Sequence, residues 1–223
     1  MSEDTIKRSV FSEQIKDSLI KGIIYGTYKP GDRLVESALA KKFGASQAPV
    51  REALKALAEM GFVTLVPYKG TIVRKMTKHE IWETVSVRSV LESFAAGLCA
   101  KVITDKQIEK LEQIAECMIK AAEVGDIEKR IDCNHEFHDE IINISGHELV
   151  KKLATNLRFA SWSYTAGTYT MMNQLAIAQR HAQIIDCMKA HDSQAAENVM
   201  REHITDTLES FLENYKDDEE NKS

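Results

Sequence analysis

Residues that could hold a metal ion lie in the C-terminal two thirds of this 223-residue chain. Asn134 and His138 are four residues apart, so on a helix they share one face. His181 and His203 follow on separate helical segments, each among apolar neighbours. Three imidazoles and one side-chain oxygen from three helices could hold Zn²⁺, Ni²⁺ or a similar ion. The alternative for each histidine is an ordinary core or surface position.

A second group of polar residues lies near the N-terminus. Ser46 can cap a helix that tolerates Pro49 in its first turn. The start of that helix presents Ser46, Gln47 and, one turn later, Arg51. Glutamine can pair with adenine, and arginine with guanine or phosphate. Lys69, at the tip of a predicted hairpin, could enter the minor groove or hold a phosphate. These residues predict a DNA-reading helix-turn-helix, whereas the alternative is a set of solvated charges.

The elements that position the second group form an N-terminal block. All three prolines lie in the first 67 residues, and this composition break places a boundary near residues 75–77. Before the boundary, apolar residues at helical spacing predict helices, and runs rich in β-branched residues predict strands. We expect helices over 6–25, 36–43 and from Ser46 to Gly61, then strands over 63–66 and 71–74 joined by a turn at 67–70.

After the boundary the chain predicts one helix after another. Thr77-x-x-Glu80 and Thr104-x-x-Gln107 are capping boxes, and Asp126 can start a further helix. We expect helices through 77–94, 104–118, 126–145, 148 into the aromatic stretch at 159–164, 171–190 and 193–211. The predicted fold is mostly α, with an N-terminal winged helix-turn-helix (1–76), a C-terminal all-helical bundle (77–215) and an acidic tail (216–223).

Charge and apolar patterning narrow the class of protein. The net charge of −5 divides into +5 over residues 1–76 and −10 over residues 77–223. A basic head suits a polyanion such as DNA. No apolar run approaches the roughly 18 residues that span a bilayer, and the N-terminus has no apolar signal core. We therefore expect a cytoplasmic protein outside the membrane, with its four scattered cysteines reduced.

The N-terminal block carries a set of motifs with a known family pattern. The pattern P-G-x-x-L-x-E, L-A, S-x-x-P-V-R-E-A-L, glycine and a hairpin glycine is matched by Pro30-Gly31, Leu34, Glu36, Leu39-Ala40, Ser46, Pro49 to Leu54, Gly61 and Gly70. This segment resembles the winged helix-turn-helix of the GntR family of bacterial transcription regulators. The resemblance implies DNA contacts at Ser46, Gln47, Arg51 and Gly70, and we add Arg33 and Lys69. The family usually has arginine at the position of Gln47, so we expect an operator unlike the family consensus.

The C-terminal block resembles the FCD ligand-binding domain of the FadR subfamily. Its D-x-x-F-H element corresponds to Asn134-His135-Glu136-Phe137-His138, with His181 and His203 at the two later histidine positions. The resemblance implies a metal held by Asn134, His138, His181 and His203 beside a small-molecule pocket. Asn134 replaces an aspartate, and a neutral amide is a weaker ligand. His135 is a possible substitute for Asn134, whereas Asp132 falls on the wrong face.

The effector implied by the resemblance is a small carboxylate. Arg88 stands where the family has a conspicuous arginine, which would complete carboxylate recognition. The alternative for Arg88 is an ion pair with Glu92, one helical turn later. Trp162, Tyr164 and Tyr169 either line the pocket or pack the bundle.

These observations predict a ligand-responsive transcription regulator, acting as a repressor and not as an enzyme. We expect a homodimer on a pseudo-palindromic double-stranded operator. The alternative is a metal-dependent helical enzyme fused to a DNA-binding head. His135-Glu136-Phe137-His138 is one residue too short for a zinc-protease motif, and the chain has no P-loop or G-x-S-x-G.

Overall fold

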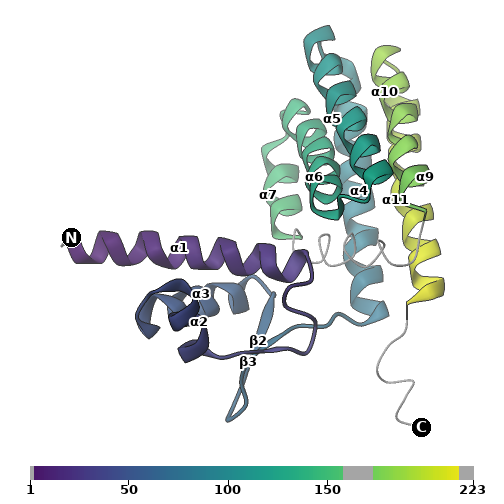
Figure 1. Cartoon of the computed structure of the whole chain (residues 1–223). Coiled ribbons are helices and arrows are strands. Elements are labelled where there is room, and N and C mark those ends of the chain that lie inside the picture. The colour runs from purple at the N-terminus through teal and green to yellow at the C-terminus, as the bar shows by residue number, and fades with distance from the viewer. Residues whose placement is uncertain (1–2, 158–172, 216–223) are drawn as a thin grey trace. The chain divides into compact units, whose positions relative to one another are not determined.

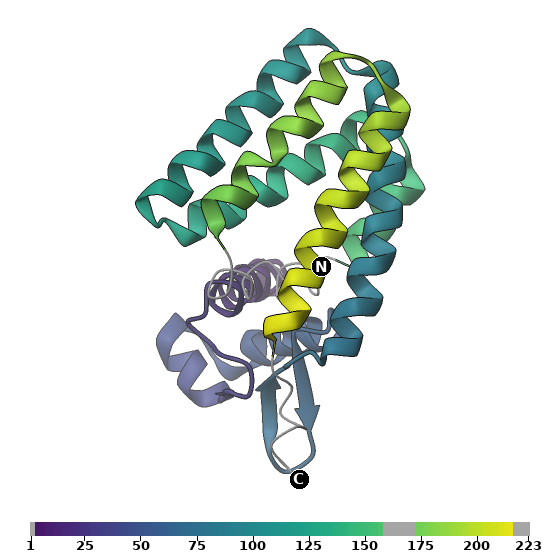
Figure 2. The same cartoon turned by 90° about the vertical axis from the view of Figure 1, so that its right-hand side faces the viewer.

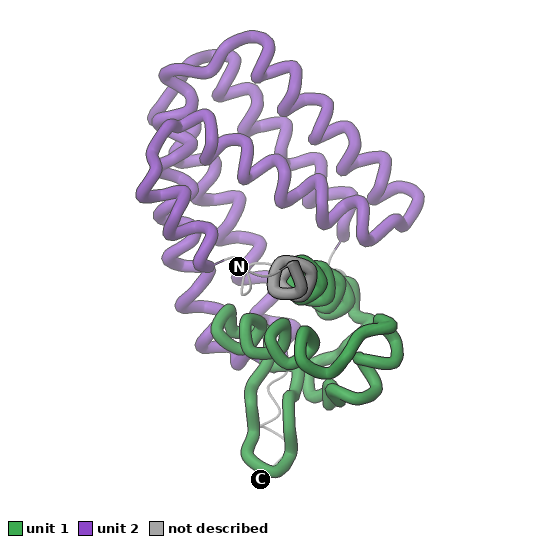
Figure 3. Tube along the Cα trace, turned by 90° about the vertical axis from the view of Figure 1, so that its left-hand side faces the viewer, with its two compact units in different colours: residues 1–75 green, residues 76–223 purple. Residues whose placement is uncertain are grey.

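The structure is a computed structural model of the chain and describes residues 3–157 and 173–215. It divides into two compact units, residues 1–75 and 76–223 (Figure 3). The sequence-based boundary placed Met76 in the first domain, whereas the structure groups it with the second unit. Met76 is buried, and its carbonyl accepts a 2.7 Å hydrogen bond from the Tyr215 hydroxyl. The tail at 216–223 lies outside the described residues.

The first unit combines three helices with a small antiparallel sheet (Figure 1). Its core is apolar, since Leu19, Val50 and Leu57 are fully buried where α1 packs on α3. The sheet order is β1-β3-β2, and the two-residue β1 was not expected from the sequence. The elements are α1 (Glu3–Ile24), β1 (Arg33–Leu34), α2 (Glu36–Phe43), α3 (Gln47–Glu59), β2 (Val63–Val66) and β3 (Gly70–Val73).

A tight turn joins α2 to α3 and sets where α3 begins. Gly44 adopts φ 62°, and its amide donates to the carbonyls of Ala40 and Lys41. A side chain in this left-handed conformation would be strained, which explains the glycine. Ser46 occupies the N-cap position of α3 as expected, but its side chain makes no capping hydrogen bond. The exposed Ser46 hydroxyl is therefore not used by the helix itself.

The second unit is a helical bundle in which α4 and α11 lie side by side (Figures 1 and 2). The reciprocal capping box at Thr77 and Glu80 starts α4, with hydrogen bonds of 2.8 and 3.2 Å. Helix α5 packs against α6 and α10. The elements are α4 (Lys78–Val102), α5 (Asp105–Val124), α6 (Ile127–Ile144), α7 (Glu148–Asn156), α9 (Gln174–Gln179), α10 (His181–Lys189) and α11 (Ser193–Asn214).

The bundle departs from the sequence-based expectation in two helices. Helix α7 ends at Asn156, and the aromatic residues Trp162, Tyr164 and Tyr169 lie outside the described residues. The helix expected over 171–190 is split at Arg180 into α9 and α10. The Nδ1 atom of His181 lies 3.2 Å from the carbonyl oxygens of Ile177 and Ala178. At the same point the Arg180 amide lies 3.3 Å from the carbonyl oxygens of both Ala176 and Ile177.

The four cysteines are free, as expected. Burial raises the pKa of the Cys99 and Cys133 thiols to about 12. Thiols in this state are not nucleophiles at neutral pH. Among the described residues, no helix combines the length and apolar character needed to cross a membrane.

Candidate metal centre and nucleic-acid interface

Three histidines from three helices converge inside the second unit. His138 comes from α6, His181 from α10 and His203 from α11, and all three are buried. Each offers one ring nitrogen, and these three atoms lie within 4.8 Å of one another. The ring centroids of His181 and His203 are 4.4 Å apart, and those of His138 and His181 are 5.6 Å apart. The tertiary structure therefore brings together the residues that spacing alone left on separate helices.

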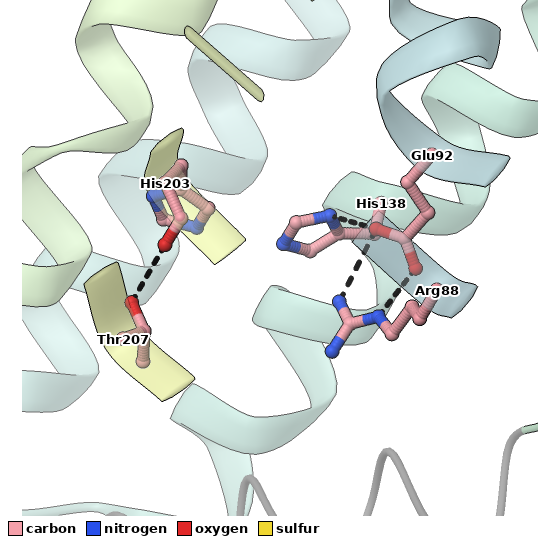
Figure 4. A network of polar contacts seen from close by, with 5 residues as sticks. All are labelled: Arg88, Glu92, His138, His203 and Thr207. Atoms are coloured by element: carbon pink, nitrogen blue, oxygen red, sulfur yellow. Dashed lines mark hydrogen bonds and ion pairs between the residues drawn. The ribbon is translucent and has the colours of Figure 1, made fainter. Parts of the chain in front are cut away.

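Glu92 orients the first of these histidines. Its Oε2 lies 2.7 Å from Nδ1 of His138 (Figure 4). With the Glu92 carboxylate against Nδ1, Nε2 is the ring nitrogen of His138 that remains to bind a cation. Glu92 also contacts the Nε atom of Arg88 through Oε1 and lies 3.2 Å from Nη2 of Arg88 through Oε2. One buried carboxylate thus joins the candidate effector residue to a candidate metal ligand.

His181 and His203 each present a ring nitrogen with no hydrogen bond. The carbonyls beside Nδ1 of His181 can only accept, so Nδ1 carries the proton and Nε2 keeps its lone pair. Nε2 of His181 and Nδ1 of His203 are buried without a hydrogen-bond partner in the described part of the chain. Unpaired buried polar atoms are unfavourable in a folded protein. A cation at the centre of the cluster would satisfy both nitrogens.

Electrostatics keep the cluster in the form that binds a cation. Burial lowers the pKa of His181 to about 3, and the charge of His138 adds to this. Burial likewise holds the pKa of His203 well below its usual range. For Glu92, burial alone would raise the pKa, but Arg88 and His138 outweigh it and hold the carboxyl far below its usual range. At neutral pH His181 and His203 therefore offer neutral imidazole lone pairs near the ionised carboxylate of Glu92.

The other sequence-predicted ligands fall in different places. Asn134 is buried one turn before His138 on α6, as their shared helix face requires. His135 is half-buried and lines a small pocket next to Arg88. Asp132 is exposed on α6, so it does not face the interior. The pocket has a volume of about 20 Å³ and is lined by Arg88, Glu92, His135, His138, Asp139, Ile142, Ala154 and Leu157.

The candidate DNA-reading residues of α3 are exposed in the first unit. Ser46 and Gln47 stand at the start of the helix, and Arg51 lies one turn further on. Arg51 forms a two-point ion pair with Glu36 of α2, with Nε 3.1 Å and Nη2 2.9 Å from Oε2. The hydrogen bond and the charge of Glu36 raise the pKa of Arg51. Sequence reasoning missed this pair, although the position of Glu36 in the first turn of α2 was visible.

The hairpin between β2 and β3 carries the remaining candidates. Gly70 adopts φ 85°, and a Cβ atom at this position would lie 3.5 Å from Nε of Arg33. The pairing of β1 with β3 brings Arg33 there, because Arg33 faces Ile72 in the register. Lys69 is exposed, and its neighbour Tyr68 is fully exposed with φ 64°. The turn predicted at Pro67-Tyr68-Lys69-Gly70 therefore presents Tyr68 and Lys69 to solvent.

Comparison with known proteins identifies both units. Residues 11–73 match the family described as bacterial regulatory proteins, gntR family, and residues 83–206 match the FCD domain. A relative named "Probable D-xylose utilization operon transcriptional repressor" from Paenarthrobacter nicotinovorans is 27% identical over 199 residues, covering 89% of this chain and 88% of the relative. The HTH-type transcriptional repressor RspR of Escherichia coli K12 is 25% identical over 206 residues, with 89% and 88% covered.

A solved structure, E. coli McbR/YncC, has the same fold. It superimposes with a TM-score of 0.81 at 23% identity, covering 92% of this chain and 99% of that one. Both sequence relatives are named as transcriptional repressors, the first as a probable one, so the alternative of a metal-dependent enzyme finds no support. The chain belongs to the gntR family of bacterial regulatory proteins and carries an FCD domain as its second unit.

Proposed function

We propose that this protein is a ligand-responsive repressor that binds a pseudo-palindromic, double-stranded operator as a homodimer. A small carboxylate effector enters the helical unit, next to a divalent metal ion such as Zn²⁺ or Ni²⁺. The observation that carries the ligand-responsive part is the buried cluster of three histidines beside the Arg88–Glu92 pair. Such a cluster contributes little to stability in the absence of a cation, because two of its nitrogens are left unpaired.

In the first unit, α3 is the helix that reads bases. Exposed at the start of α3, Gln47 would pair with adenine and Arg51 with guanine or phosphate. In the free protein Glu36 occupies the Arg51 guanidinium, so DNA must displace this exposed pair before Arg51 can contact a base or phosphate. Arg33, Lys69 and Gly70 belong to the hairpin, where close backbone approach and positive charge suit a phosphate or the minor groove.

In the second unit, His138, His181 and His203 hold the metal with Asn134 as a fourth ligand. Nitrogen donors with one amide oxygen suit Zn²⁺ or Ni²⁺. When bound, the metal supplies a positive charge that attracts a carboxylate. Arg88 supplies the second positive charge from α4. In the described structure Arg88 is paired with Glu92, so an effector carboxylate must compete with Glu92 for the guanidinium.

The helix that carries Arg88 and Glu92 provides the route to the DNA-reading unit. Helix α4 begins at its Thr77 capping box, directly after the first unit ends at Lys75. An effector that moves Arg88 or Glu92 acts on this helix. To switch the protein, the effector must bind one conformation more tightly than the other.

The metal is tested by elemental analysis of untagged protein purified without chelator. We expect close to one divalent ion per chain in the wild type and a large loss in His181→Ala. His79→Ala is the matched control, because His79 is exposed near the start of α4 and outside the cluster. Equal metal content in wild type and His181→Ala would remove the metal from the proposal.

DNA binding is tested by selecting genomic fragments with the full-length protein at moderate salt. We expect a specific, roughly two-fold symmetric site that a small carboxylate releases when metal is present. A protein that shows no specific fragment would contradict the regulator role of this chain.

A further inference from the structure

One side of α4 is apolar and exposed over several turns. Val87, Val90 and Phe94 keep 51%, 54% and 43% of their surface exposed. Other sides of α4 pack against α11, α6 and α7 (Figures 1 and 2). A stripe of this kind is typical of a helix that packs on another protein surface. The α4 stripe consists of Glu83, Val87, Val90, Phe94, Leu98 and Lys101.

The residues of the α4 stripe are arranged symmetrically in sequence around position 92, although Glu92 itself points away from the stripe and is buried. Val90 and Phe94 lie two residues on either side of Glu92, and Glu83 and Lys101 lie nine residues on either side. Glu83 and Lys101 are 18 residues apart, which is about five helical turns, so both lie on the same side. An antiparallel second copy of α4 would place Val90 against the partner's Phe94. It would also place Glu83 against the partner's Lys101.

This complementarity favours a second copy of the chain over another partner. A two-fold contact requires a surface that fits itself, with opposite charges related by the symmetry axis. The α4 stripe has an acidic end, an apolar middle and a basic end. A parallel arrangement would instead place Glu83 against the partner's Glu83, and like charges there are unfavourable.

The middle of the stripe also contains a prearranged anchor. The Phe94 ring lies edge-on to the His147 ring, with 5.5 Å between the ring centroids. His147 caps the N-terminus of α7 through its ring nitrogen, which ties Phe94 to a fixed element. Aromatic side chains held in place commonly dominate protein interfaces.

We propose that two copies of this chain associate through an antiparallel α4–α4 contact along this stripe. The contact rests on the homodimer of the proposed function and names the surface that forms it. Because α4 also carries Arg88 and Glu92, the subunit contact and the candidate effector residues share one helix. An effector that moves α4 would then change the orientation of the two subunits relative to each other.

The first test is sedimentation equilibrium of the full-length protein with Phe94→Glu. The matched control is Val124→Glu, which places the same charge at an apolar residue that is 79% exposed at the end of α5. We expect Phe94→Glu to raise the dimer dissociation constant by about 30-fold or more. The control should change it by less than about threefold. Circular dichroism verifies that both variants keep their helices.

The second test reverses the end charges, which leaves the apolar middle intact. Glu83→Lys alone and Lys101→Glu alone each replace two attractive contacts by two repulsive ones. Each should weaken the dimer by about tenfold. The double variant restores opposite charges and should return the dissociation constant to within about twofold of the wild type.

The outcomes separate this surface from the homodimer itself. A wild-type dimer that is insensitive to Phe94→Glu and to both charge reversals would overturn the α4 stripe while leaving the homodimer in place. A wild-type protein that stays monomeric on its operator would overturn both. Single reversals that weaken the dimer without recovery in the double variant would overturn the antiparallel pairing.

Discussion

Arg51 and Arg88 each form a two-point ion pair with a glutamate, but in opposite surroundings. The Arg51–Glu36 pair of the first unit has side chains that are 57% and 33% exposed. The Arg88–Glu92 pair of the second unit has side chains that are 6% and 7% exposed. Exposed pairs contribute little to stability and open easily. Removing one partner of a buried pair is strongly destabilising, because the other charge stays buried.

The difference corresponds to what each arginine is proposed to do. Arg51 must leave its partner whenever DNA arrives, so a weak, solvent-screened pair suits it. Glu92 also contacts His138, so the buried pair positions a candidate metal ligand as well as an arginine (Figure 4). The same residue types therefore form an exposed pair on the proposed DNA-reading helix of one unit and a buried pair beside the histidine cluster of the other.

Among substitutions that test the contrast between the two ion pairs, Glu92→Gln should cause the largest loss of stability. We expect it to lower the free energy of unfolding by about 3–5 kcal/mol, since Arg88 loses its buried counter-charge. Glu36→Gln is the matched change at the exposed pair and should cost about 0–1 kcal/mol. Urea unfolding followed by circular dichroism measures both. Similar losses in the two variants would erase the contrast.

The next effect is a pH dependence of the folding stability, which we expect from the buried histidines of the second unit. In chelator-treated protein, the pKa of His181 is lowered to about 3 and that of His203 is also lowered. The unfolded chain therefore binds more protons than the folded chain below about pH 6.5, and stability falls as the pH falls. We expect a loss of up to about 1.4 kcal/mol per pH unit for each histidine between pH 6.5 and 5.

Unfolding curves at several pH values, with His181→Gln for comparison, measure this dependence. Glu92 is ionised in both states above about pH 5, so its lowered pKa does not contribute in this range. His181→Gln should show about half the slope of the wild type. An unchanged slope in the variant would mean that His181 is not held neutral by the fold.

A smaller effect is expected at the exposed arginine. Arg51→Ala should weaken operator binding by about 1–3 kcal/mol for each half-site, which is the value of a good base contact. Its unfolding free energy should change by less than about 1 kcal/mol, because the lost ion pair is exposed. Fluorescence anisotropy on the selected operator and urea unfolding give the two values. Operator affinity that survives the substitution would exclude Arg51 as a reader.

The smallest effect concerns the hairpin. Lys69→Ala should remove one phosphate contact from each subunit, so the slope of log affinity against log salt should fall by about 1.8 for the dimer. The loss should be uniform across operator sequences, since a phosphate contact carries no base information. Binding curves at several salt concentrations test this. A sequence-dependent loss would assign Lys69 to the bases instead.

Much of the local structure was predictable because its causes are local. The capping box at Thr77 and Glu80 acts over three residues, and the structure has it as predicted. Gly44 ends α2 and Ser46 precedes α3, again through contacts within one turn. Asn134 and His138 are four residues apart, and this spacing correctly predicted that they share one helix face, which is buried.

Features that depend on distant residues were not predictable in this way. The two-residue β1 exists only because β3 supplies its partner strand. The Arg51–Glu36 pair joins residues 15 apart on two helices. The break between α9 and α10 at Arg180 interrupts a stretch that apolar periodicity predicted as one helix.

By itself, the sequence determined the two-part organisation, the DNA-reading motif and the candidate metal ligands, because each is written in short-range patterns of residue type. Only the tertiary structure decided that His138, His181 and His203 meet, and that Glu92 joins Arg88 to His138. The tertiary structure also decided that the Arg88–Glu92 ion pair is buried and the Arg51–Glu36 ion pair is exposed. Burial sets the effective dielectric around a charge, and that depends on every element packed nearby.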